Sequence, residues 1–131
     1  MSVIPSLAAG LAQLQALAEF LDSGSNYATF IFYDDSKPID TTVAANNSAK
    51  LVTLVLQKPC FKQLLSDGIE LFPSDAATII KTGTAIWARL YNGNGVIVAD
   101  FAVGTDILLN NNDLVLGSSL TLDSIILKPL G

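Results

Sequence analysis

The groups able to do acid–base or metal chemistry in this 131-residue chain are mostly carboxylates. Asp34, Asp35 and Asp40 fall in one polar stretch, and Asp106 and Asp113 flank a triplet of asparagines. Neighbouring acids in a loop can bind Ca²⁺ through oxygen, but an EF-hand type of site requires ligands at alternating positions, a central glycine and a distal glutamate. Neither stretch has that order, so both are interpreted as solvated turns and no metal site is predicted.

The other reactive residue types are scarce. The chain has no histidine, and it therefore lacks the commonest general base and the commonest metal ligand. Its one cysteine, Cys60, has no histidine to activate it and is expected to be a buried, inert thiol. A glycosidase would need two carboxylates converging across a cleft, and nothing in the spacing indicates such a pair. We predict that the protein is not an enzyme and binds no cofactor.

Trp87 and Tyr91 suggest one further chemistry, the stacking of a sugar ring on an aromatic platform. Ordinary packing, or contact with a partner protein, is the favoured interpretation of these two side chains. Carbohydrate binding is kept as the alternative function.

The composition indicates a single domain that is poor in charge. Half of the residues are apolar and 15% are charged, against roughly 25% in an average soluble domain. This shortage indicates that part of the surface is buried against other chains, and it predicts a homo-oligomer or a subunit of an assembly. The alternative is a neutral surface rich in asparagine, serine and threonine.

The charge distribution argues against two kinds of partner. The net charge is −5 and the seven basic residues are scattered, so no cluster could follow a nucleic-acid backbone. The longest apolar stretch, residues 6–21, is interrupted by polar residues, so no membrane span is predicted. Residues 1–5 carry no basic side chain, which disfavours a signal peptide.

The first element expected is an amphipathic helix. Pro5 suits a first helical turn, Ser2 or Ser6 could cap it, and the turn residues 22–26 end it. Its apolar residues recur at alternating steps of three and four, at Ile4, Leu7, Leu11, Leu14, Ala18 and Leu21. Such a short seam cannot hold a coiled coil alone, so the helix is expected to dock onto a sheet or onto a neighbouring subunit.

From Tyr27 onward the pattern changes to short β-rich runs separated by turn residues. Residues 60–67 are interpreted as one helical turn or a loop. The expected strands are 28–33, 50–56, 69–72, 76–80, 83–91, 96–103, 106–109, 114–116 and 120–127. Short strands at a spacing of roughly ten residues are typical of a β-sandwich or jelly roll.

The segment Asn92-Gly-Asn-Gly95 between two β-rich runs is a strong hairpin signal. A four-residue loop places Leu90 opposite Ile97 and Arg89 diagonal to Asp100, within reach of an ion pair. A two-residue Asn92-Gly93 turn would shift the register by two and keep the same faces. The apolar residues of one face would then lie in the core. The other face, with Trp87 and Val98, is too apolar for solvent and is expected to be half covered by the helix or another chain.

Three strings in this chain carry a resemblance: Gly83-Thr-Ala-Ile-Trp-Ala-Arg-Leu-Tyr91, Val103-Gly-Thr105, and Phe30-Ile-Phe-Tyr33 followed by Lys37-Pro38. Together they make residues 28–127 similar to small proteins encoded among the structural genes of tailed bacteriophages and prophages. Ala88 departs from that pattern, which has an aromatic residue there, and Asn-Gly-Asn-Gly replaces its Asp-Gly turn. The resemblance implies a virion structural component and no catalytic residue.

These observations predict an all-β protein, an antiparallel β-sandwich or jelly roll with one N-terminal α-helix. Residues 1–26 would be a docking and assembly segment, and residues 27–131 the sandwich. The protein would be made in the bacterial host cytoplasm and assemble with itself and with other virion proteins, on the capsid exterior or at the head–tail neck. The alternative is a tail-associated or host-glycan-binding module. The predicted interface residues are Leu7, Leu11, Leu14, Leu21, Trp87 and Val98.

Overall fold

A computed structural model describes residues 6–129. Its one α-helix, α1, spans Leu7–Leu21. Ser6 is the N-cap, as expected, and its hydroxyl accepts a hydrogen bond from the Ala9 amide at 3.2 Å. The predicted caps and turns upstream, at Ser2 and Pro5, lie outside the described residues. Within the described chain no helix is long and apolar enough to cross a membrane.

The main sheet contains four antiparallel strands in the order β2-β1-β7-β8. Its strands are β1 Thr29–Tyr33, β2 Lys50–Val55, β7 Trp87–Tyr91 and β8 Ile97–Ala102. A short 3₁₀ helix, Asn47–Ala49, leads into β2. This sheet uses the predicted runs 28–33 and 50–56 and the predicted hairpin, because their β-branched and aromatic residues fit a pleated, half-buried surface.

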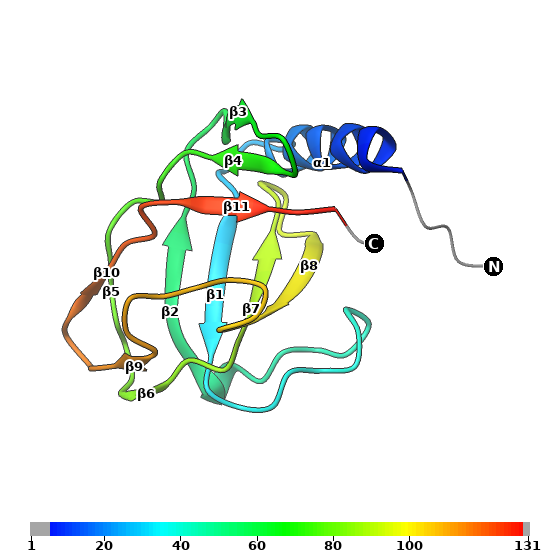
Figure 1. Ribbon diagram of the computed structural model, residues 1–131. Coiled ribbons are helices and arrows are strands. Elements are labelled where there is room, and N and C mark those ends of the chain that lie inside the picture. Colours follow the sequence, from blue (N-terminus) through cyan, green and yellow to red (C-terminus); the bar gives the residue numbers. More distant parts are fainter. Residues whose placement is uncertain (1–5, 130–131) are drawn as a thin grey trace.

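A second sheet contains β3 Phe61–Leu64, β4 Ile69–Leu71 and β11 Ile125–Leu127, in the order β11-β4-β3. Its strands run across the direction of the main-sheet strands in Figure 1, and α1 packs against β3 and β4 at the same end of the molecule. The prediction of a helical turn or loop at 60–67 was therefore wrong. Pairing with the apolar strand β4 gives this largely exposed segment its extended conformation.

Two short ribbons complete the described strands. One pairs β5 Ala77–Thr78 with β10 Ser119–Leu120, and the other pairs β6 Gly83–Thr84 with β9 Asp113–Leu114. The predicted strand 106–109 is a turn with a single bridge, and the predicted strand 120–127 is divided into β10 and β11. Tertiary pairing partners, rather than local propensity, decide where these short segments are extended.

One apolar core joins the helix and both sheets. Leu21 of α1, Phe30 and Leu54 of the main sheet, and Leu71 and Ile125 of the second sheet are all fully buried in it. The all-β class with one helix is thus confirmed. The finer description as a sandwich or jelly roll stays a prediction, because the two ribbons lie beside the larger sheets and belong to neither.

The hairpin has the predicted faces near its middle but a different register. Leu90 pairs with Ala99 and Tyr91 with Ile97, so a β-bulge at Val98 adds one residue to β8. Arg89 therefore lies directly opposite Asp100 instead of diagonal to it. The bulge also places Val98 against the core.

Candidate interaction groove

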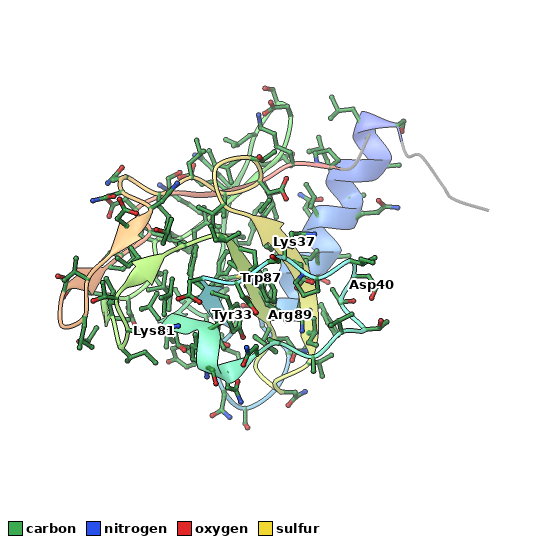
Figure 2. The ribbon with its side chains drawn as sticks, turned by 90° about the horizontal axis from the view of Figure 1, so that it is seen from below. Tyr33, Lys37, Asp40, Lys81, Trp87 and Arg89 are labelled. Atoms are coloured by element: carbon green, nitrogen blue, oxygen red, sulfur yellow. The ribbon has the colours of Figure 1, made fainter. Side chains whose placement is uncertain are left out.

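The outer face of the hairpin is covered by the chain itself, through residues 34–46, which we call the covering loop. The Trp87 ring stacks on Tyr33 at 4.4 Å between centroids, and its indole N–H donates to Asp35 at 2.7 Å. Both aromatic residues are buried. In Figure 2 the part of the loop that carries Lys37 and Asp40 passes across the labelled cluster of this face.

Arg89 holds the covering loop against the hairpin. Its Nε and Nη2 donate to the two carboxylate oxygens of Asp100 at 2.6 and 3.0 Å, and its Nη1 donates to the Val43 carbonyl at 2.8 Å. The guanidinium also lies 5.1 Å from the centroid of the Trp87 ring. The hydrogen bonds to Asp100 raise the pKa of Arg89 above its ordinary value. This arrangement holds the loop in place through a buried, fully paired charge.

Two expectations about this face are corrected by that arrangement. The cover comes from the covering loop and not from the helix or another chain. The Trp87 side chain is 0% exposed, so it is unavailable as a sugar platform or as an interface residue in this fold. A 13-residue polar loop gave no local signal that it would fold back over the sheet.

The structure has an open groove of about 1370 Å³ on a different side of the molecule. One wall is α1, which contributes Leu14 and Leu17, and another is β8 with the following turn, residues 103–111. The C-terminal segment 113–129 closes the remaining side. Leu108 is 73% exposed and Ile126 is 40% exposed at this groove, so it offers apolar side chains to solvent.

Exposed acidic side chains, which we call the rim, line the groove. They are Asp106, Asp113 and Asp123, whereas the one basic residue of the lining, Lys128, lies 3.5 Å from the carboxylate of Asp67 outside the lining. The fourth acid of the lining, Asp100, is neutralised by its buried partner on β7. The lining therefore combines exposed apolar side chains with an excess of negative charge.

The predicted interface residues separate into three groups. Leu7 is 54% exposed and Leu11 is half-buried on α1, so both are accessible. Leu14 lines the groove while most of its surface is in the core. Leu21 and Trp87 are fully buried within the chain, and Val98 packs against the core. The hydrophobic pattern found apolar faces correctly but could not tell which faces the chain covers itself.

The candidate catalytic and metal-binding residues serve local structure. Asp34 forms an ion pair with Lys81 at 2.8 Å, and Asp40 accepts hydrogen bonds from Thr42 that lower its pKa. Among residues 6–129, no group of three or more His, Cys, Asp or Glu side chains could hold a metal ion. Burial raises the pKa of the Cys60 thiol to about 12, which makes it unreactive at neutral pH.

Sequence reasoning missed the groove because its walls come from three segments, α1, β8 with the following turn, and the C-terminal segment, which meet only in the folded chain. One local signal was present: Leu108 and Val115 are apolar residues of two short expected strands that flank the asparagine-rich turn. Both are exposed in the structure and line the groove. Apolar residues in such short runs beside a turn are therefore the feature that could have indicated this surface.

Comparison with known proteins adds no relative from which a function could be transferred. No family model matches the chain, and neither a curated protein nor a solved structure matches it.

Proposed function

We propose that this protein is a non-enzymatic structural component of a tailed-phage virion, a decoration or neck protein that assembles on the capsid exterior or at the head–tail junction. The observation that carries this proposal is the groove, a concave surface at which Leu108 and Ile126 expose large apolar side chains to solvent. The partners are other virion proteins and further copies of this chain. The resemblance of residues 28–127 to phage structural proteins supports the same conclusion.

The chemistry of the described residues agrees with a role in assembly. The carboxylates are used in turns, caps and ion pairs, and the strongest charge pair is buried beneath the covering loop. Low charge density leaves the surface suited to contacts with other proteins. Carboxylates that are used in this way can bind and position a partner protein, and we propose no catalytic pair among them.

The test is the protein content of purified phage particles. Particles from a phage or induced prophage that encodes this chain are purified through a density gradient, analysed by mass spectrometry and imaged by cryo-EM. We expect the chain at a stoichiometry that matches a symmetric position on the head or neck, with density that fits the fold of residues 6–129. A chain that stays in the lysate, with no copy on gradient-purified particles, would contradict the proposal.

A further inference from the structure

We propose that the groove binds a segment of another virion protein in which apolar side chains alternate with lysine or arginine. This inference names the partner chemistry of the site used above and rests on the proposed function. The exposed apolar side chains and the acidic rim each select one property of that segment.

The apolar side chains of the lining select the first property. Leu108 and Ile126 lie on different walls, one in the turn after β8 and the other on β11, and both expose large apolar surface at the groove. Phe101 and Leu109 also line the groove and are partly buried against the core, so apolar side chains of the lining continue into the core. An occupant with apolar side chains would remove this surface from water, which is the main source of favourable free energy in such contacts.

The rim selects the second property. Asp106, Asp113 and Asp123 are exposed in the lining, and the carboxylates of the first two are hydrogen-bonded to the Ala102 amide and the Thr84 hydroxyl, which holds them in place. Fixed negative charge at an interface speeds association with a positively charged partner and disfavours an acidic one. The complementary segment therefore carries lysine or arginine beside its apolar residues.

The same charge argument favours another protein over a second copy of this chain as the occupant of the groove. The chain has a net charge of −5, so copies repel one another on average. Strand β3 is exposed and carries both apolar and basic residues, as the proposed occupant does. Its Lys62 ammonium, however, already forms an ion pair with the Glu70 carboxylate at 3.5 Å. Self-association through this strand is an outcome that the experiment must detect.

The probes are three labelled peptides of equal length, alternating Leu and Lys, Leu and Glu, or Ser and Lys, titrated into the full chain by fluorescence anisotropy. We expect the Leu/Lys peptide to bind at least about tenfold more tightly than either of the others, and its affinity to fall as salt is added. Equal affinities for the three peptides, or no binding of the Leu/Lys peptide, would overturn the proposal.

Matched variants locate the binding. Leu108→Ser/Ile126→Ser removes exposed apolar groups and Asp123→Asn removes one rim charge, so each should weaken binding of the Leu/Lys peptide. Ile39→Ser and Asp75→Asn make the same changes at exposed positions outside the groove lining and should leave binding unchanged. Because all these side chains are exposed, far-UV circular dichroism should be identical for every variant. Loss of binding in the controls, or retention in the groove variants, would refute the assignment.

Sedimentation velocity without peptide tests the competing occupant. A dimer or larger species that disappears in Leu108→Ser/Ile126→Ser would assign the groove to a second copy and overturn the proposal.

Failure of the peptide experiment can be told apart from failure of the virion test. Peptide binding by a chain that is absent from particles would refute the proposed function, and with it the origin of the bound segment in a virion protein, but not the apolar and basic character of that segment. A chain present on particles without peptide binding would refute only this inference.

Discussion

At the scale of single residues, the pair Arg89–Asp100 is the position where a substitution should matter most. Both side chains are almost fully buried, at 1% and 5% exposure, and the pair is bidentate. Buried charges are tolerated only while they are paired, because an unpaired buried ion has lost its hydration without compensation. The covering loop depends on the same guanidinium through the Val43 carbonyl.

We therefore predict that Asp100→Asn lowers the free energy of unfolding by about 3 kcal/mol, because it leaves a buried guanidinium without its counter-charge. The measurement is urea denaturation followed by the fluorescence of Trp87, which lies against Arg89. The matched control is Asp67→Asn, which removes the partner of Lys128 from an ion pair that is 60–66% exposed and should have no measurable effect. Equal effects of the two substitutions would contradict this account of the buried pair.

At the scale of elements, the turn 92–95 does more than reverse the chain. The Asn92 side chain is buried and accepts hydrogen bonds from the amides of Asn94 and Val96, which fixes the turn. A Cβ on Gly93 would collide with the carbonyl oxygens of Ser23 and Asn26. The turn therefore docks against the segment that leaves α1, a contact that the sequence did not indicate.

This contact predicts different costs for two glycines of one turn. Gly93→Ala places a methyl group against backbone atoms that cannot rotate away, and we expect it to cost about 3 kcal/mol of unfolding free energy. Gly95→Ala meets open space and pays only for a residue at φ +78°, which we expect to cost about 1 kcal/mol. Chemical denaturation of both variants measures the difference, and a larger loss in Gly95→Ala would show that the docking contact is unimportant.

The elements also show how far local sequence determines this fold. The helix with its Ser6 cap, strands β1, β2 and β4, and the hairpin were predicted because their periodicity and turn residues are local signals. β3 was missed because its extended form depends on pairing with β4. The bulge at Val98 was missed because register depends on packing across the sheet.

The candidate site was less predictable than the elements. Leu14 was expected at an interface from its place on the helix, and it does line the groove. The remaining walls come from the turn after β8 and from the C-terminal segment, which meet only in the folded chain. Trp87 was assigned to an interface because its face is apolar, and no local pattern could show that residues 34–46 cover it.

At the scale of the whole molecule, α1 belongs to the same core as the sheets. Leu14, Ala18 and Leu21 are buried with residues of both sheets, and the Cys60 amide donates to the carboxylate of Asp22 at the end of the helix at 3.1 Å. The helix was expected to dock onto a sheet or onto a neighbouring subunit, and it packs against β3 and β4 of this chain. Its shared core indicates that helix and sheets unfold together.

We predict a single unfolding transition in which the signal of Trp87, the far-UV signal of α1 and the sheets, and the calorimetric transition coincide. Leu21→Ala should lower the free energy of unfolding by about 3 kcal/mol, since it leaves a cavity in a fully buried site, and should shift all three signals together. Leu7→Ala, at a position that is 54% exposed on the same helix, should leave them almost unchanged. An early loss of helical signal in Leu21→Ala, with the Trp87 transition unmoved, would mean that α1 is a separable segment after all. Its surface would then be free for docking, whereas a common transition leaves the groove as an accessible surface of one cooperative unit that includes α1.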